Sequence, residues 1–215
     1  MKILIADDHG IVREGLRSLI EKEPDMEVAG EAKNGLEAVE LAKQLAPDVV
    51  IMDISMPGLN GIDATRLIVS ENPKVKIIVL SIHAERHIVK EVLSAGAAGY
   101  VLKTYLFEEL SRALRSVLTN GYYLSPKVTS IVVGGYLDDS VNVRARDGVD
   151  LTGREREVLQ LIAEGKTSKE IALMLHVSPK TVETHRRKLL EKIEASGVAE
   201  LTKYAIREGI TSVEF

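Results

Sequence analysis

The chain of 215 residues is long enough for two compact domains, and its 45% hydrophobic and 28% charged residues exclude a disordered or fibrous protein. It contains no cysteine, which excludes disulfides, thiol nucleophiles and thiolate metal sites. The formal net charge is -4, no apolar run approaches the roughly 20 residues of a membrane span and no signal-peptide pattern is present, so we expect a cytoplasmic protein without a membrane partner.

Residues 1–121 alternate short β-branched runs with segments of helical periodicity. This alternation is typical of βαβ units, which build a parallel sheet with helices on its faces. We therefore predict an α/β domain with a doubly wound parallel sheet of five strands. The candidate strands are Ile3–Ala6, Val28–Ala32, Val49–Met52, Ile77–Leu80 and Gly99–Leu102.

Residues 122–150 interrupt this alternation and are predicted to link two domains. Ser125–Leu137 is expected to form one extra helix, and the polar segment 138–150, which has no periodic apolar face, is expected to be a tether. Residues 151–215 are wholly helical in pattern and predict an all-α domain of four helices. The first of them begins at a capping box made by Thr152 and Glu155 and ends at Gly165, and the others are predicted at 168–175, 179–193 and 198–208.

Three carboxylates follow two of the predicted strands. Asp7 and Asp8 come directly after the first strand, and Asp53 ends the third. In a doubly wound sheet, ligands gather beyond the carboxyl ends of the strands where the strand order reverses, so we expect these side chains to converge there. Like charges at such range are costly, so either one carboxyl has a strongly raised pKa or a divalent cation lies among them. Mg²⁺, a hard cation that prefers oxygen ligands, is the simpler account.

Two further strand ends add a hydroxyl and an ammonium group to this edge of the sheet. Ser81 follows the fourth strand and Lys103 follows the fifth. With a metal ion, this set suits phosphoryl transfer, in which an Asp53 oxygen attacks in line while Lys103 neutralises the developing charge. A single aspartate after a strand is more often a turn residue, and a single lysine is usually a solvated charge. Their conjunction at four strand ends favours a site.

The first domain resembles the receiver domains of two-component signalling over residues 1 to about 121. The matching motifs are Ile5-Ala6-Asp7-Asp8-His9, the run from Val50 to Gly61 around Asp53, Val79-Leu80-Ser81 and the run from Ala95 to Lys103. The resemblance implies a (βα)5 fold with strand order 2-1-3-4-5. It also implies a sensor histidine kinase as the partner that passes a phosphoryl group to Asp53.

The same resemblance implies a role for each residue of the site. Magnesium would be bound by Asp8, Asp53, the backbone carbonyl of Ser55 and, mainly through water, Asp7. Ser81 and Lys103 would hold the phosphoryl oxygens, and Tyr100 would act as a switch by filling the space that Ser81 leaves. For Tyr100 the alternative is a half-buried strand aromatic. Thr104 stands where many relatives have proline after the lysine, which leaves the geometry of the Lys103–Thr104 bond open.

A basic helix that begins at a proline follows a short helix and a tight turn in the second domain. This order is typical of a helix-turn-helix, with residues 169–175 as the supporting helix and a recognition helix that starts at Pro179 after the capping residue Ser178. Val182, Leu189 and Ile193 would face the core of the domain. An exposed basic face is more often merely solvated, so the pattern by itself leaves DNA binding open.

The second domain resembles the LuxR-type domain of the NarL class of regulators over residues 151 to about 210. The matching residues include Leu151-Thr152, Arg154-Glu155, Lys169-Glu170-Ile171-Ala172, Ser178, Lys180-Thr181-Val182, His185-Arg186 and Lys192-Ile193. By this resemblance the residues that reach base edges are Glu183, Thr184 and Arg187, and those that bind DNA phosphates are Lys180, Thr181 and Lys188. Relatives commonly have lysine at position 183, so Glu183 is a departure that puts the operator sequence in doubt.

The last predicted helix is similar to the dimerisation helix of this class. It carries Val198, Leu201, Tyr204 and Ala205 on one side. The alternative, packing within the core of the domain itself, must hold for at least some of these residues.

Together these features predict a phosphorylation-controlled transcription regulator that binds paired half-sites in double-stranded promoter DNA as a homodimer, with RNA polymerase as a further candidate partner. We expect no enzyme activity apart from self-catalysed phosphoryl transfer to Asp53 and slow dephosphorylation. A closed resting form, in which the receiver covers the recognition helix, is a hypothesis from the resemblance. Two other functions stay open: a metal-dependent phosphohydrolase, which would turn over phosphoesters steadily, and an adaptor that binds proteins but no DNA.

Overall fold

The computed structural model describes residues 1–119, 121–139, 149 and 151–211. The first domain contains a parallel sheet with the strand order β2-β1-β3-β4-β5-β6. Its strands are β1 (Lys2–Ala6), β2 (Glu27–Ala32), β3 (Val49–Asp53), β4 (Lys76–Ser81), β5 (Gly99–Leu102) and β6 (Tyr123–Leu124). The five expected strands and their order are confirmed, and a sixth strand extends the sheet beyond β5.

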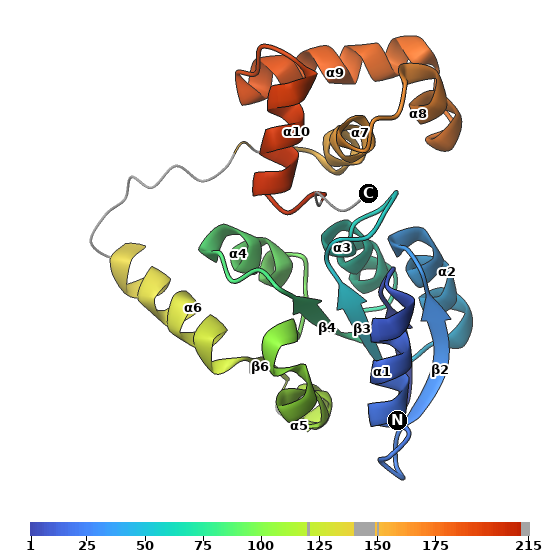
Figure 1. The fold of residues 1–215 in the computed structure, drawn as a ribbon, viewed down its shortest axis with the longest axis vertical. Coiled ribbons are helices and arrows are strands. Elements are labelled where there is room, and N and C mark those ends of the chain that lie inside the picture. The colour runs from blue at the N-terminus through green and yellow to red at the C-terminus, as the bar shows by residue number, and fades with distance from the viewer. Residues whose placement is uncertain (120, 140–148, 150, 212–215) are drawn as a thin grey trace.

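Helices cover both faces of this sheet (Figure 1). One hydrophobic cluster joins the sheet to α1 (Gly10–Ile20) and α5 (Leu106–Thr119), and a second cluster joins it to α2 (Gly35–Leu45), α3 (Gly61–Glu71) and α4 (Arg86–Ser94). The strands β3 and β4 are almost continuous runs of buried valine, isoleucine and leucine, as expected for parallel strands covered on both faces. β1 lies between β2 and β3, so the strand order reverses beside the carboxyl ends of β1 and β3.

Part of the predicted linker belongs to the first domain. The two residues of β6 pair with β5, and α6 (Pro126–Asp139) packs on α4 with Val128 buried in the core. Ser125 fixes the junction, because its hydroxyl donates to the Glu109 carboxylate and accepts from the backbone N–H of Leu102. The predicted extra helix is therefore present. The polar tether predicted at residues 138–150 falls largely outside the described residues.

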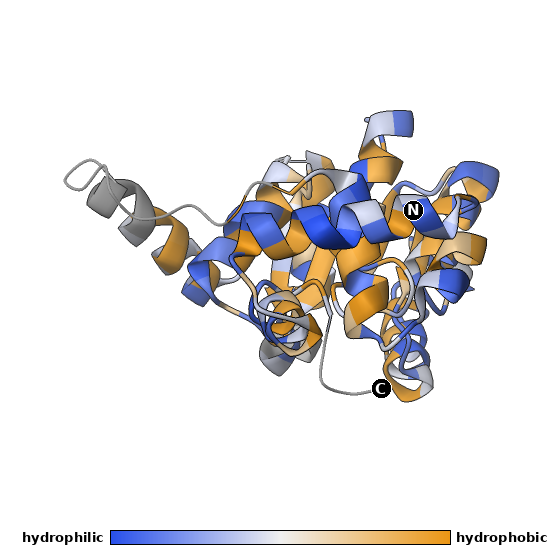
Figure 2. Cartoon of the chain, turned by 90° about the horizontal axis from the view of Figure 1, so that it is seen from above, coloured by the Kyte–Doolittle hydropathy of each residue, from blue (hydrophilic) through white to orange (hydrophobic). Residues whose placement is uncertain are grey.

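The second domain consists of α7 (Gly153–Ala163), α8 (Ser168–Met174), α9 (Pro179–Ile193) and α10 (Val198–Arg207) around a hydrophobic core of their own. The predicted capping box of Thr152 and Glu155 begins α7, and Ser178 caps α9 through the backbone N–H of Thr181. Hydrophilic residues lie along the outer turns of the helices (Figure 2). Among the described residues, no helix is long and apolar enough to cross a membrane.

The second domain sits over the carboxyl edge of the sheet, with α7 and α10 toward the first domain and α9 on the far side (Figure 1). The hypothesis that the receiver covers the recognition helix therefore does not describe this arrangement. The outward residues of α9 are exposed, namely Lys180, Glu183, Thr184, Arg187 and Lys188.

Candidate functional site

An acidic cluster lies at the carboxyl edge of the sheet. β1 and β3 pair in register, Ala6 beside Met52, and this pairing brings the residues that follow them together. Carboxylate oxygens of Asp7, Asp8 and Asp53 and a ring nitrogen of His9 all lie within 4.8 Å of one another. Asp7 and Asp53 are 1% and 4% exposed. The three predicted carboxylates therefore converge as expected.

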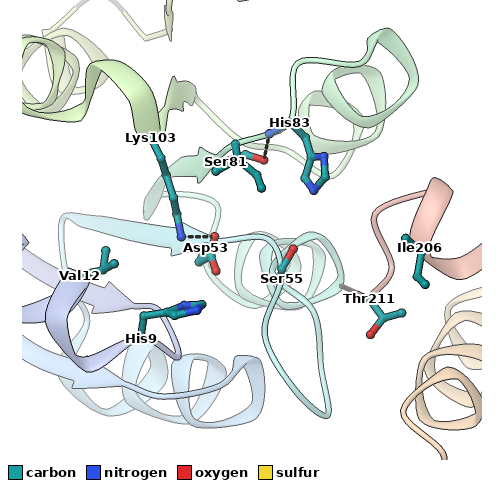
Figure 3. Close-up of a pocket in the computed structure, with 10 residues that line it drawn as sticks. His9, Val12, Asp53, Ser55, Ser81, His83, Lys103, Ile206 and Thr211 are labelled. Carbon is teal, nitrogen blue, oxygen red and sulfur yellow. Dashed lines mark hydrogen bonds and ion pairs between the residues drawn. The ribbon is translucent and has the colours of Figure 1, made fainter. Parts of the chain in front are cut away.

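Lys103 lies between two of these carboxylates. Its Nζ atom is 2.9 Å from Asp53 Oδ1 and 2.9 Å from Asp7 Oδ2 (Figure 3). Burial raises the pKa of Asp53 to about 6; the Lys103 ammonium opposes this rise, whereas the charges of Asp7 and Asp8 add to it. Burial would lower the pKa of Lys103, but the two carboxylates outweigh burial and raise it. Asp53 is therefore mainly ionised at neutral pH, beside a lysine that stays charged.

The cluster fits a magnesium ion. Asp8 Oδ1 is buried without a hydrogen bond in the described structure, and His9 Nδ1 lies 2.7 Å from it. A buried carboxylate oxygen without a donor is costly, and a hard cation with oxygen ligands would remove that cost. Ser55, whose carbonyl was predicted as a further ligand, lines the cavity next to Asp53.

The loop between β3 and α3 is held close to Asp53. A Cβ atom at Gly61 would lie 1.8 Å from the Asp53 carbonyl oxygen, so this close approach requires glycine. Asn60 caps α3 by accepting a hydrogen bond of 2.9 Å from the backbone N–H of Asp63. The turn and the cap together fix the loop that carries Ser55.

Ser81 and Tyr100 lie around a second loop at the site. The Ser81 hydroxyl, at the end of β4, accepts a hydrogen bond of 2.9 Å from the backbone N–H of His83. Tyr100 is completely buried, and its hydroxyl donates to the carbonyl oxygen of His83 at 2.8 Å. Burial raises the pKa of Tyr100 to about 12. Both predicted residues therefore contact one loop, and Tyr100 is more deeply buried than the half-buried alternative requires. The Lys103–Thr104 bond is trans.

A cavity of about 450 Å³ opens above Asp53. The wall on the first domain includes Val12, Ser81, Ile82 and His83, and the wall from the second domain includes Ile206 and Thr211 (Figure 3). Ile206 and Thr211 were not predicted from the sequence. No signal in the second domain connects them with a site more than a hundred residues earlier in the chain.

The recognition helix presents a basic face with one acidic exception. The predicted base-contacting and phosphate-contacting residues are exposed except for Thr181, which is half-buried. Val182 and Leu189 are fully buried on the opposite side, as predicted. Glu183 accepts a hydrogen bond from the Ser168 hydroxyl at the start of α8, and Arg186 lies 3.9 Å from it. The unusual acidic side chain is thus drawn toward the supporting helix.

Most of the predicted dimerisation residues lie in the core of the second domain. Leu201 and Ala205 are fully buried there, and Tyr204 is 7% exposed. Val198, at the start of α10, is 38% exposed. Core packing therefore accounts for Leu201 and Ala205, and the part of α10 that faces outward begins at Val198.

Comparison with known proteins covers both domains. Residues 3–115 match the family model of the response regulator receiver domain, and residues 149–205 match that of the bacterial regulatory proteins of the luxR family. The transcriptional regulatory protein LiaR of Bacillus subtilis is 40% identical over 212 residues, which cover 99% of this chain and 100% of LiaR.

Two solved structures of the response regulator RcsB are similar over nearly the whole chain. RcsB from Salmonella enterica serovar Typhimurium, bound to the promoter rprA in the presence of the phosphomimetic BeF3-, is 30% identical with a TM-score of 0.63, and the match covers 95% of this chain and 97% of that one. A structure of two RcsB dimers bound to two parallel DNAs is 28% identical with a TM-score of 0.58, and the match covers 95% of this chain and 96% of that one.

Proposed function

Because the chain belongs to the response regulators that join a receiver domain to a LuxR-type DNA-binding domain, we propose that a phosphoryl group on Asp53 controls how α9 binds promoter DNA. The observation that carries this proposal is the contact of Lys103 with both Asp53 and Asp7 at the floor of one cavity. Receiver domains take their phosphoryl group from a histidine kinase, which makes such a kinase the expected partner.

The receiver residues supply the parts of an in-line phosphoryl transfer. An oxygen of ionised Asp53 attacks the phosphorus of a phosphohistidine, the P–N bond breaks, and the imidazole leaves with the electron pair and takes a proton from water. The Lys103 ammonium then pairs with a phosphoryl oxygen, and the Ser81 hydroxyl donates to another. Bound Mg²⁺, held by Asp8, Asp53, the Ser55 carbonyl and water on Asp7, would supply charge neutralisation at the transferring group. Attack of water on the phosphorus slowly releases the group again.

On the DNA side, the exposed face of α9 supports insertion into the major groove. Arg187 has the paired donors that suit guanine, and Thr184 can contact a thymine methyl. Lys180, Thr181 and Lys188 are proposed to bind phosphates and so to set the register of the helix on the duplex. RcsB binds DNA as dimers, and we expect the same of this chain, with the outward part of α10 from Val198 at the dimer contact. RNA polymerase remains a candidate partner of the bound dimer.

The test treats the full chain with acetyl phosphate and Mg²⁺, and measures its intact mass and its affinity for promoter DNA. We expect the mass of one phosphoryl group on Asp53 and a rise in specific affinity, and neither in the matched variant Asp53→Asn. Unmodified Asp53 in well-folded protein would contradict the proposal. Steady turnover of a phosphoester would instead indicate the phosphohydrolase, and the absence of a salt-dependent affinity for promoter DNA would favour the adaptor.

A further inference from the structure

A glutamine of the second domain binds the loop that follows Asp53. Gln160 on α7 is fully buried, and its Oε1 atom accepts hydrogen bonds of 3.0 Å from both the backbone N–H and the side-chain amide of Asn60. Its Nε2 atom donates to the carbonyl oxygen of Met56 at 3.0 Å and to Glu164 Oε1 at 2.8 Å. Glu164 Oε1 also accepts from the backbone N–H of Gly58 at 3.0 Å. Three residues of the loop are thus tied to α7.

A partly buried ion pair between the two domains supports this contact. Arg156, one turn earlier on α7, donates through two nitrogens to the Glu91 carboxylate of α4. The Arg156 side chain is 11% exposed and that of Glu91 is 27% exposed, so solvent screens the pair only in part. A bidentate pair of this kind fixes orientation as well as distance. The Arg156–Glu91 pair thus fixes the position of α7 relative to α4, and in this position Gln160 reaches the loop.

The end of α10 and the residues that follow it also pack on α4. His87 Nε2 on α4 lies 2.9 Å from the Arg207 carbonyl oxygen, and Ile88 packs so close to Gly209 that a Cβ there would lie 3.1 Å from it. This packing brings Ile206 and Thr211 over the phosphoacceptor cavity. The Thr211 hydroxyl is buried there without a hydrogen bond in the described structure.

We propose that Gln160 restrains the phosphoacceptor site: together with the Arg156–Glu91 pair it holds the loop after Asp53 and keeps the second domain over the cavity, so that docking and phosphorylation oppose each other. This inference rests on the proposed function. Gln160 and Arg156 are then the residues of the DNA-binding domain that restrain the reaction at Asp53.

The opposition has a physical cause. Phosphorylation changes an ionised carboxylate into an acyl phosphate with about one more negative charge, and the new group needs hydrogen-bond donors, whereas the docked domain places the apolar side chain of Ile206 on the wall of the cavity. The Met56–Asn60 segment follows Ser55 directly, and Gln160 binds both ends of that segment. Because the coupling of two equilibria is reciprocal, whatever phosphorylation does to docking, docking does to phosphorylation.

The test compares initial rates of Asp53 phosphorylation by phosphoramidate and Mg²⁺, and the radius of gyration in solution, for the full chain and its variants. We expect Gln160→Ala, Arg156→Glu and Glu91→Arg each to react at least about threefold faster and to be more extended, because the reactive fraction rises. The double variant Glu91→Arg/Arg156→Glu restores the pair with its charges exchanged, and it should return toward the original rate and size. Gln44→Ala, an exposed glutamine on α2, is the matched control and should change neither.

Equal rates in the chain and in its three single variants would overturn the inference, as would a double variant that stays fast. Since Glu91 lies in the first domain and Arg156 in the second, misfolding of one variant leaves the other to decide. Failure of every variant to accept a phosphoryl group would contradict the proposed function instead. In that case the radius of gyration alone decides whether these residues hold the domains together.

Discussion

The ammonium of Lys103 lies 2.9 Å from the carboxylate of Asp53 and favours the ionised form of this buried acid. It opposes the rise in pKa that burial causes and keeps Asp53 mainly ionised at neutral pH. In the proposed function the same ammonium pairs with a phosphoryl oxygen once Asp53 has reacted. Ionisation of Asp53 and the proposed stabilisation of the transferring group would therefore depend on one side chain.

Replacement of Lys103 by methionine should slow phosphorylation of Asp53 by about 100-fold, because an oriented donor to the developing charge is lost. The pKa of Asp53 should rise further, because the ammonium that lowers it is removed. The rate with acetyl phosphate, measured against pH, checks both effects, since the apparent pKa of the reaction should move upward as well. A rate that Lys103→Met leaves within twofold of the original would contradict the assignment.

The stability of the metal-free protein should depend on Asp53 and pH. The pKa of Asp53 is raised in the folded state from 3.8 to about 6, so its favourable contribution is present at low pH and is lost as pH rises between these values. Above pH 6, Asp53→Asn should therefore be more stable than the original chain by up to about 3 kcal/mol in a chelator. Urea unfolding at pH 7.5 and pH 4 measures this difference, which should nearly vanish at the lower pH.

Addition of Mg²⁺ should stabilise the original chain and not Asp53→Asn, because only the former keeps the full set of carboxylates. The same unfolding experiment with and without the ion gives this result directly. An equal gain in both proteins would place the ion elsewhere.

Two glycine substitutions should have opposite effects on stability. Gly61→Ala places a methyl group 1.8 Å from the Asp53 carbonyl oxygen, so it should cost more than about 3 kcal/mol or displace the loop. Gly15→Ala, on α1, meets nothing within 4 Å, and it should stabilise the protein by about 0.5–1 kcal/mol. Thermal unfolding measures whether each variant is more or less stable than the original chain. A Gly61→Ala variant of unchanged stability would contradict the close approach.

Two substitutions on α9 should separate base contacts from phosphate contacts. Arg187→Ala should cost about 1–3 kcal/mol on the specific site and relax discrimination at one base pair. Lys188→Ala should weaken binding to all sequences about equally and reduce the salt dependence by about one ion. Titrations of specific and random duplexes at several salt concentrations distinguish the two. Identical profiles for both variants would show that the roles are assigned wrongly.

The carboxyl edge of the sheet around Asp53 could be predicted from sequence because its residues obey local rules. Buried parallel strands are recognisable as β-branched runs, and Asp7, Asp53, Ser81 and Lys103 each end or follow such a run. The register of β1, β3, β4 and β5 then brings them to one edge. In contrast, the two-residue strand β6 is too short to produce any alternation, and the sequence shows only the helix after it.

The contacts between domains could not be predicted, since they involve residues whose type is ordinary for a helix surface. Gln160 and Arg156 would be solvated on an isolated α7, and only the docked structure buries them. The partner of the apolar side of α10 could not be predicted for a related reason. An apolar stripe has the same periodicity whether it faces the core of its own domain or a second molecule, so burial of Leu201 could not be separated from dimerisation beforehand.

The outward orientation of α9 in the docked arrangement affects how this regulator searches the chromosome. Lysine and arginine side chains that meet the DNA backbone give an affinity that ignores sequence and allows sliding along the duplex. If Lys180 and Lys188 make such contacts, as proposed, their exposure would leave that affinity in place before any signal arrives. A stimulus would then act on molecules already travelling along DNA, and it would decide where they pair and stop rather than whether they land.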